Sequence, residues 1–588
     1  MLHVPTVTRA HRVLSLVALV CAGTALAACR TSPSPTAQPY NVLLVSLDTV
    51  RQNVLGAYGH RPRHAPDAAI SPAFDQFARA GVRMADAYSS SAWTLPAHLS
   101  MMTGLPALAH AVDTENGVLD PAIPTLAEIL SRHGYRTIGI YSAPFLDAHW
   151  GFGRGFDSYT AVYGAAAAAA SEHNEALRHD SEVAAAAGDW ARYDALRREQ
   201  AEAARALDES SQTVVTSEQV ATAAVTALET LARAGRPWFL FAHFFDAHCD
   251  YVPPPPYDTR FDPDYRGTFK GENCMGGPAV GTPDPDNPGA LLRTLGDRDL
   301  EHAFALYEGE VGWVDDHLGM ILRALDRTGM AGTTLVIVVA DHGEEFFEHA
   351  GLGHRRTLYD EVVRVPMVLR LPGVLPAGRT VTGPVSLADL VPTVLDVLGL
   401  PAVATVGSAS FAAALRGAET ADHGVLLRTV IMFGGTVTVD QGAPVALRQV
   451  VVQDGFRAGD VKITRQRSWP QFEANLAPDV EAVLLREAAA QYGRETLRWI
   501  DAAHSPDEPA GAWSTDFSAP AARAALAAFR AAYAAAVARR PAEQRTSAVP
   551  HNVRTKLESL GYIARESGPT FPEPDLVLPP PGDGGVAH

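Results

Sequence analysis

Two long apolar runs predict buried β-strands, and each run ends in side chains that bind metals. The first is Asn41-Val-Leu-Leu-Val-Ser-Leu, followed by Asp48, and the second is Thr333-Thr-Leu-Val-Ile-Val-Val-Ala, followed by Asp341 and His342. Strands that are apolar on both faces are typical of parallel sheets covered by helices. Because ligands of open α/β sheets bind at the carboxyl ends of the strands, we expect Asp48, Asp341 and His342 to lie together. One divalent metal ion would fit there.

Each of these residues also has an ordinary structural interpretation. A lone Asp after a strand is commonly a turn residue or a helix N-cap, and Asp48 taken alone fits that role. The second run is denser in possible ligands, because carboxylates and imidazoles recur until the glycine-containing loop that ends at His354. These further residues are Glu344, Glu345, Glu348 and His349. Their density favours a metal site at Asp341 and His342.

A predicted helix between the two strands supplies a hydroxyl group. In Ser91-Ala-Trp-Thr-Leu-Pro-Ala-His-Leu-Ser-Met-Met-Thr-Gly104, Pro96 suits a first helical turn and Gly104 suits a helix end. Thr94 therefore stands at the N-terminal end of the helix, where unpaired backbone N–H groups and the helix dipole favour an alkoxide or an ester oxyanion. The ordinary alternative is that Thr94 only caps the helix.

Alternating strand and helix patterns predict a catalytic domain of α/β architecture at residues 40–425. An Ala-rich insertion at 161–211 should be helical, either as a lid over the site or as a product of compositional drift. We expect a smaller α+β subdomain at 426–565 and a disordered Pro-rich tail at 566–588. The clearest single elements are helices at 123–133, 300–327 and 521–539 and a strand at 446–452.

The N-terminus predicts a signal peptide at residues 1–28 and a Ser-, Thr- and Pro-rich tether at 29–39. Arg9 and Arg12 precede a short apolar run, as in secreted proteins. The following Leu-Ala-Ala-Cys29 resembles the lipobox of bacterial lipoproteins, which implies a lipid-modified Cys29 and attachment in the bacterial envelope, at the outer membrane or the periplasmic face. A plain secretory signal and a retained anchor are the alternatives, although the run is shorter than the ~20 residues that span a bilayer.

Composition constrains the partners and the redox state. Loss of the signal peptide leaves 46 basic and 66 acidic residues, a net charge near −20. Nucleic acid is therefore disfavoured as a partner, because phosphate backbones bind clusters of Lys and Arg and none is apparent. In an oxidising envelope, Cys249 and Cys274 could form a disulfide that stiffens the loop after His248.

A series of motifs runs in order through most of the chain. The segments are Asn41-Val-Leu-Leu-Val-Ser-Leu-Asp48, Leu55-Gly-Ala-Tyr-Gly59, Thr94-Leu-Pro-Ala-His98, Thr125-Leu-Ala-Glu-Ile-Leu130, Gly155-Phe-Asp157, His243-Phe-Phe-Asp-Ala-His248, Tyr307-Glu-Gly-Glu-Val-Gly-Trp-Val-Asp315, Asp341-His-Gly343 and Thr357-Leu-Tyr-Asp-Glu-Val-Val-Arg-Val-Pro366. This series resembles the sulfatase family within the alkaline phosphatase superfamily. The resemblance implies a mixed sheet flanked by helices, a smaller C-terminal α+β subdomain, and a metal-dependent hydrolase or transferase.

Several positions depart from the usual pattern of that family. Usual sulfatases oxidise the first residue of a Cys/Ser-x-Pro-x-Arg motif to formylglycine, whereas here Thr94 and His98 hold the first and last positions. Threonine cannot give the aldehyde, so we expect no formylglycine. The second Asp of the family's Asp-Asp pair is Thr49, and the Asn after the later Asp is His342. The chain has only three lysines, so the family's paired substrate lysines are largely missing.

The remaining set, Asp48, Thr94, Asp341 and His342, resembles that of phosphodiesterases, phosphatases and phosphoethanolamine or glycerol-phosphate transferases in the same superfamily. This resemblance implies one divalent metal held by these four residues, and a Thr94 nucleophile that forms a phosphothreonine. An imidazole ligand in place of an amide favours Mn²⁺ or Zn²⁺ over Ca²⁺ and Mg²⁺.

The resemblance also implies roles for the residues around this set. His98 would belong to the catalytic group, and His248 would contact the ester oxygens or protonate the leaving group. His354 and Arg355 would bind substrate, and His354 could also hold a second metal. His248 could instead be a packing residue, because aromatic strand ends often bury histidines.

We therefore expect an anionic ester substrate, either a glycan, a lipid head group or a small molecule, with a phosphoester preferred. The first alternative is a sulfuric ester hydrolase. The second is a non-catalytic binding protein on the same fold.

Overall fold

The computed structural model describes residues 39–162, 216–271, 281–283, 291–419, 422–438, 444–472, 494–505 and 507–550, with a few isolated positions besides. The chain divides into Met1–Tyr40 and Asn41–His588, and all elements below belong to the second unit. The predicted signal peptide, the tether, the Ala-rich insertion and the C-terminal tail lie outside the described residues, isolated positions excepted. Within the described part, no helix combines the length and apolar character that crossing a bilayer requires.

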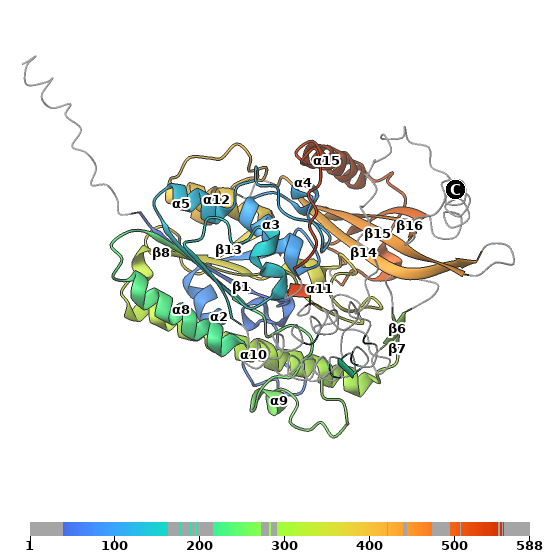
Figure 1. Ribbon diagram of the computed structural model, residues 1–588, viewed down its shortest axis with the longest axis horizontal. Coiled ribbons are helices and arrows are strands. Elements are labelled where there is room, and N and C mark those ends of the chain that lie inside the picture. Colours follow the sequence, from blue (N-terminus) through green and yellow to red (C-terminus); the bar gives the residue numbers. More distant parts are fainter. Residues whose placement is uncertain are drawn as a thin grey trace, which may run out of the picture. The chain divides into compact units, whose positions relative to one another are not determined.

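A nine-stranded mixed sheet forms the centre of this unit, in the order β11-β2-β12-β8-β1-β5-β3-β4, with β13 paired to β2 (Figure 1). Strands β8, β1, β5, β3 and β4 run parallel, whereas β12 and β11 run antiparallel to their neighbours. The strands are β1 (Asn41–Leu47), β2 (Val82–Tyr88), β3 (Arg136–Tyr141), β4 (Ser158–Ala161), β5 (Trp238–Phe244), β8 (Thr334–Ala340), β11 (Arg364–Val365), β12 (Met367–Arg370) and β13 (Arg379–Ser386).

Three adjacent strands in the middle of this sheet carry the predicted site. Every residue of β1, β5 and β8 is buried, which explains their apolar sequences. Leu47 at the end of β1 is paired with Phe244 of β5 and with Ala340 of β8. The three strands therefore end at the same level, and the residues that follow them lie side by side.

Helices cover both faces of the sheet (Figure 1). The layer on one face contains α2 (Pro72–Ala80), α8 (Ser217–Leu231) and α10 (Asp297–Arg327), and the layer on the other contains α3 (Thr94–Thr103), α5 (Leu126–Arg132) and α12 (Leu390–Leu398). The predicted helix 123–133 begins later, because Thr125 and Glu128 form a capping box. The predicted helix 300–327 begins earlier, with two acidic residues that suit the positive end of a helix dipole.

A four-stranded antiparallel sheet follows in the C-terminal part of the chain. Its strands are β14 (Val425–Thr438), β15 (Pro444–Ala458), β16 (Val461–Phe472) and β17 (Arg494–Asp501). The helix α15 (Pro520–Val537) packs on it, with Phe529 against Phe456 and Ile463. The strand predicted at 446–452 lies within β15, and the helix predicted at 521–539 corresponds to α15.

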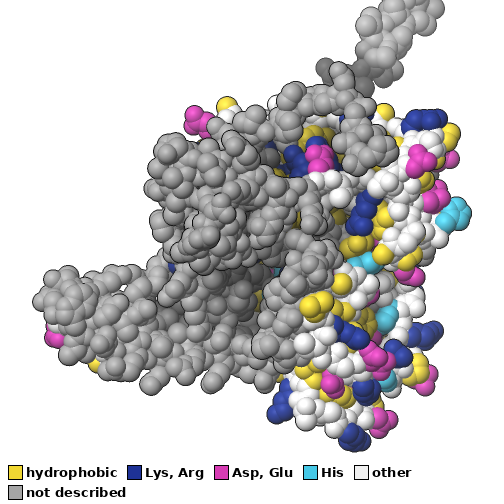
Figure 2. Space-filling model, turned by 90° about the vertical axis from the view of Figure 1, so that its right-hand side faces the viewer, with side chains coloured by type: hydrophobic (Ala, Val, Ile, Leu, Met, Phe, Trp, Pro, Cys, Tyr) yellow, Lys and Arg dark blue, Asp and Glu magenta, His cyan; other side chains and the backbone are white. Residues whose placement is uncertain are grey.

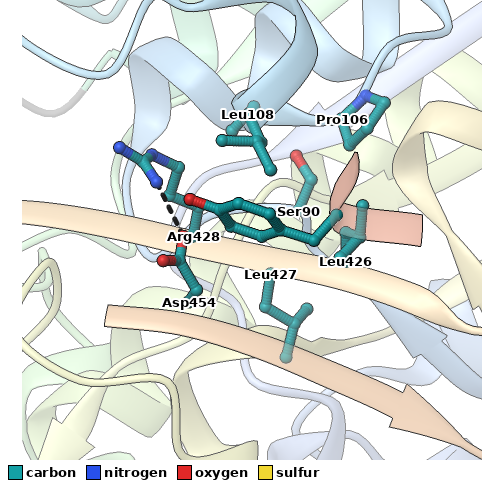
Figure 3. Close-up of a pocket in the computed structure, with 9 residues that line it drawn as sticks. Ser90, Pro106, Leu108, Leu426, Leu427, Arg428 and Asp454 are labelled. Atoms are coloured by element: carbon teal, nitrogen blue, oxygen red, sulfur yellow. Dashed lines mark hydrogen bonds and ion pairs between the residues drawn. The ribbon is translucent and has the colours of Figure 1, made fainter. Parts of the chain in front are cut away.

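Arg428 of β14 connects this sheet to the segment that precedes Thr94. Its Nε donates to Asp113 Oδ2 and its Nη1 to Asp454 Oδ1, each over 2.7 Å, and its side chain is 1% exposed. Its backbone N–H donates to the carbonyl of Ser90 over 2.9 Å. Figure 3 shows the guanidinium group of Arg428 beside Asp454, in a pocket that Ser90 and Leu427 also line. A buried ionic contact thus supports the start of α3.

We expect Arg428→Met to lower the free energy of unfolding by about 3–5 kcal/mol, measured by urea denaturation. The substitution removes the cation from buried Asp113 and leaves Asp454 with Arg467 alone, over 2.9 Å. The control is Arg465→Met on β16, because Arg465 pairs with a Glu495 side chain that is 54% exposed. That change should cost at most about 1 kcal/mol. Equal losses in the two variants would contradict the proposed role of Arg428.

Candidate active site

The ends of β1 and β8 bring Asp48, Asp341 and His342 together. Their ligand atoms all lie within 4.8 Å of one another, and all three residues are buried. His342 Nε2 is 3.3 Å from Asp341 Oδ2 and 3.6 Å from Asp48 Oδ1. Ligand atoms that share one ion at about 2 Å stand about 3–4 Å apart. The spacing of the cluster therefore suits a single metal ion.

The protonation state of His342 suits the same role. Its Nδ1 lies 3.0 Å from the carbonyl oxygen of Gly343, so Nδ1 carries the proton and donates it. The lone pair of Nε2 then points to the two carboxylates. Burial lowers the pKa of His342 well below its usual value, and the nearby His354 adds to this effect. The ring is thus a neutral ligand whose orientation is set by a backbone contact.

The electrostatic environment of the Asp48 and Asp341 carboxylates favours a bound cation. Burial raises the pKa of Asp48 well above its usual value, and Glu344 raises it further. Burial and then Asp48 raise the pKa of Asp341 in the same way. Among the described residues, neither oxygen of Asp48 nor Oδ2 of Asp341 has a hydrogen-bond partner of normal geometry. Buried charges of one sign are costly without a counter-charge, so these residues fit a divalent ion.

Thr94 is the first residue of α3 and presents its hydroxyl group to this cluster. Its Oγ1 lies 3.3 Å from His342 Nε2, and the residue is 1% exposed. Trp93, not Thr94, is the N-cap residue, and no side chain caps this helix. The interpretation of Thr94 as an ordinary N-cap is therefore wrong. Gly104 ends the helix with a positive φ of 71°, as predicted.

His98 lies one turn further along α3, next to Thr94. Its Nδ1 donates to the carbonyl oxygen of Thr94 over 3.0 Å and is 3.3 Å from Asp341 Oδ2, and its Nε2 accepts from the Ser46 hydroxyl over 2.9 Å. Burial and the neighbouring His243 lower its pKa well below the usual value. The resemblance implies a place for His98 in the catalytic group, and in the structure the ring contacts Ser46, Thr94 and Asp341.

His248 and His354 form a wall of the site beside His342. The His354 ring lies 4.4 Å from that of His342 and 4.8 Å from that of His248, between ring centroids. His248 Nδ1 donates to the carbonyl of Cys249 over 2.7 Å, and His354 Nδ1 contacts Glu344 Oε1 over 2.9 Å. Burial lowers the pKa of each imidazole to about 3. Two neutral rings thus lie next to the cluster.

Arg355 is placed near the start of α3. Its guanidinium carbon lies 4.2 Å from the centroid of the Trp93 ring, and its Nη2 pairs with Glu115. Its φ of 79° is unusual for a residue with a side chain. The guanidinium group of Arg355 therefore lies beside Trp93, the residue before Thr94. Its positive charge is already paired with the carboxylate of Glu115.

The structure also shows three site residues that the motif analysis left without a role, namely Ser46, His243 and Glu344. Ser46 was recognisable as the polar residue two places before Asp48 in an otherwise apolar strand. His243 and Glu344 stood inside quoted motifs, but nothing in their spacing indicated their partners. His243 Nε2 lies 3.2 Å from Asp48 Oδ2.

The other acidic residues after Asp341 form a separate cluster. Glu345, His349 and Glu361 bring their polar atoms within 4.8 Å of one another, and Glu348 pairs with Arg51. Burial opposes a charge on His349, but its contact with Glu361 outweighs burial and raises its pKa to about 9. Its Nε2 also contacts the carbonyls of residues 507 and 508, each over 3.1 Å. Because Nδ1 contacts Glu361 and Nε2 contacts two carbonyls, we interpret this cluster as an ion pair rather than a metal centre.

Two further sequence predictions concern cysteines. Cys249, directly after His248, is disulfide-bonded. Cys274, its predicted partner, lies outside the described residues, as does Cys29.

Figure 2 shows one face of the molecule, on which Lys and Arg side chains lie interspersed with Asp and Glu side chains among the described residues. The described residues on this face form no continuous cationic area of the kind that a phosphate backbone binds.

Comparison with known proteins extends the similarity over most of the catalytic part. YidJ of Escherichia coli (strain K12), an uncharacterized sulfatase, is 28% identical over 360 residues, which are 60% of this chain and 67% of YidJ. Human arylsulfatase K is 34% identical over 104 residues, which are 18% of this chain and only 19% of arylsulfatase K.

Solved structures share the fold. Phosphonate monoester hydrolase of Agrobacterium radiobacter has a TM-score of 0.55 at 22% identity, over 84% of this chain and 96% of that one. BT4656, solved in complex with its substrate D-glucosamine-2-N,6-O-disulfate, has a TM-score of 0.55 at 14% identity, over 85% of this chain and 98% of that one. These likenesses establish the mixed sheet between helices and the C-terminal antiparallel sheet as a known fold.

The model of the sulfatase family matches residues 40–400, more than half of the chain. This match agrees with the motif series and with the fold. The chain therefore belongs to the sulfatase family and is a sulfatase-like hydrolase.

Proposed function

We propose that this enzyme acts on an anionic ester through Thr94 as the nucleophile, as a metal-dependent hydrolase or transferase that prefers phosphoesters. The observation that carries the proposal is the hydroxyl of Thr94, 3.3 Å from His342 Nε2 at the first position of α3. Threonine cannot supply the aldehyde on which the usual sulfatases depend. A hydroxyl at this place can instead attack the substrate directly.

The residues around Thr94 supply what such an attack needs. The start of α3 offers unpaired backbone N–H groups and the positive end of the helix dipole to an anionic ester. A divalent ion held by Asp48, Asp341 and His342 would lower the pKa of a nearby hydroxyl and screen the repulsion between two anions. The imidazole of His342 favours Mn²⁺ or Zn²⁺ over Ca²⁺ or Mg²⁺ for this place.

In the proposed reaction, Thr94 Oγ1 forms a bond to phosphorus while the bond from phosphorus to the leaving oxygen breaks. Thr94 Oγ1 loses its hydroxyl proton as it attacks, and the leaving alcohol takes up one proton in exchange, so the step balances, while His248 and His354 contact the ester oxygens. Water then releases phosphate from Thr94 in a hydrolase, and an acceptor alcohol does so in a transferase.

A sulfuric ester hydrolase is the second candidate. The similarity to YidJ, which is named a sulfatase, favours it. In that case Thr94 would attack sulfur, or would orient a water molecule that does.

A matched panel of aryl esters separates these candidates. The purified enzyme, loaded with Mn²⁺ or Zn²⁺ or stripped by a chelator, should hydrolyse an aryl phosphate or an aryl phosphodiester faster than the aryl sulfate with the same leaving group. Only the loaded enzyme should be active. Turnover of the sulfate alone would reject the phosphoester proposal and leave the family assignment intact.

We also propose that Cys29 carries the lipid of an envelope lipoprotein, because the motif before it resembles a lipobox. Two or more acyl chains are needed for stable anchoring, and the lipoprotein pathway provides them. The wild-type protein should therefore fractionate with membranes, and Cys29→Ser should release it or block its processing. Unchanged membrane association of the variant, followed by immunoblotting, would show that the anchor is another segment.

A further inference from the structure

The two carboxylates of the cluster are held in different ways. Asp341 has its outer oxygen, Oδ1, fixed by two backbone N–H groups, those of His342 over 2.8 Å and Thr49 over 3.3 Å. Its Oδ2 faces His342 Nε2. Asp48 also presents one oxygen, Oδ1, to His342 Nε2, whereas its Oδ2 has no hydrogen bond of normal geometry among the described residues.

The hydroxyl of the residue after Asp48 contacts backbone carbonyls rather than the Asp48 carboxylate among the described residues. Thr49 has a positive φ of 55°, and its hydroxyl donates to the carbonyl of Ala247 over 2.6 Å. Thr49 therefore directs its side chain away from the cluster. Asp48 is the single side chain that the end of β1 contributes, so the orientation of its carboxylate matters for the whole cluster.

His243 occupies the place beside the outer oxygen of Asp48. It is paired with Ser46 in the register between β5 and β1, so the two side chains point to the same face of the sheet. Its Nε2 lies 3.2 Å from Asp48 Oδ2, and both side chains are fully buried. His243 does not belong to the group of converging ligand atoms formed by Asp48, Asp341 and His342. Its effect on an ion would therefore pass through Asp48.

We propose that His243 is a positioning residue of the metal centre. Its Nε2 lies 3.2 Å from Asp48 Oδ2, outside the geometry of a formed hydrogen bond, and donates to that oxygen when the site holds its ion, which leaves Oδ1 facing His342 Nε2. This inference rests on the metal centre of the proposed function. An imidazole can hold the carboxylate without adding a positive charge that would repel the ion. Hydrogen bonds to a metal-binding carboxylate of this kind typically contribute 10- to 100-fold to metal affinity.

The experiment measures metal affinity rather than turnover, by competition between the purified protein and a fluorescent chelator for Mn²⁺ and for Zn²⁺. His243→Phe keeps a ring of similar size among aromatic neighbours such as Phe241 but removes the donor. It should weaken binding about 10- to 100-fold. His243→Gln keeps an N–H donor near the position of Nε2, so it should recover most of the affinity.

His110→Phe is the matched control, because His110 is equally buried but its contacts are with Ser100, Pro96 and Val112. It should lose stability without losing metal affinity, with circular dichroism checking that every variant is folded. The inference is overturned if His243→Phe binds metal within about twofold of the wild type, or if His110→Phe loses as much affinity. A wild-type protein that binds neither Mn²⁺ nor Zn²⁺ would overturn the metal centre of the proposed function. Normal metal binding by both the wild type and His243→Phe would overturn only the role of His243.

Discussion

Replacing Thr94 with alanine is expected to abolish ester turnover while the protein stays folded. The loss of a covalent nucleophile costs several orders of magnitude in rate, because the remaining groups can only bind and orient the substrate. Thr94 is buried at the first position of α3 and caps nothing, so the fold should tolerate the change. Steady-state rates with the best ester of the panel and circular dichroism measure the two effects.

Two companion variants identify the mechanism behind that loss. Thr94→Ser keeps a hydroxyl and should keep part of the activity. Intact-mass measurement after rapid quenching should detect a phosphate adduct on the wild type that Thr94→Ala lacks. A formylglycine mechanism predicts another pattern, in which Thr94→Cys gains sulfatase activity when a formylglycine-generating enzyme is co-expressed. Robust sulfate turnover by the wild type without any adduct would reject the phosphothreonine mechanism.

Asp341→Asn should remove the metal and the activity together. The amide can still accept from the backbone N–H groups of Thr49 and His342, so the local structure is preserved while one negative charge is lost. Asp48→Asn and His342→Ala should act in the same direction, since each removes a ligand. Metal content, measured by elemental analysis after gel filtration, should fall in step with the rate.

Glu345→Gln is the control for Asp341→Asn. Glu345 is also a buried carboxylate, and it accepts from the N–H of Gly351 over 2.7 Å and from Thr357 over 3.0 Å. It belongs to the cluster that contains the protonated His349, so its replacement should leave the metal content unchanged. Full metal occupancy in Asp341→Asn, or its loss in Glu345→Gln, would show that the ion binds elsewhere.

The sequence predicted the part of the site that follows from strand ends. Asp48, Asp341 and His342 could be predicted to meet because apolar runs imply parallel strands, and such strands end at one edge of a sheet. The start of α3 was predictable from Pro96 and its end from Gly104, although the sequence could not tell whether Thr94 capped the helix or faced the cluster. That choice depends on the contact with His342, which tertiary packing decides.

Other contacts could not be predicted because they depend on strand register. The contact of His243 with Asp48 requires β5 to lie next to β1 in one alignment, and neither strand carries a pattern that specifies it. The density of acids after Asp341 was partly misleading for the same reason. Glu345 and His349 follow Asp341 closely in the chain, but the short hairpin of β9 (Glu345–Phe346) and β10 (Leu352–Gly353) carries them to a separate cluster.

The placement of the ligands on the central strands links metal supply to the lifetime of the folded enzyme. Asp48 and Asp341 extend directly from β1 and β8, which are among the most buried strands of the sheet. An ion bound there would oppose global unfolding rather than the opening of a loop. An ion that binds only the native state at a hundred times its Kd contributes about 2.7 kcal/mol. Removal of the ion by a chelator would therefore make the whole domain more sensitive to proteases. Metal-free enzyme molecules would be degraded before metal-bound ones.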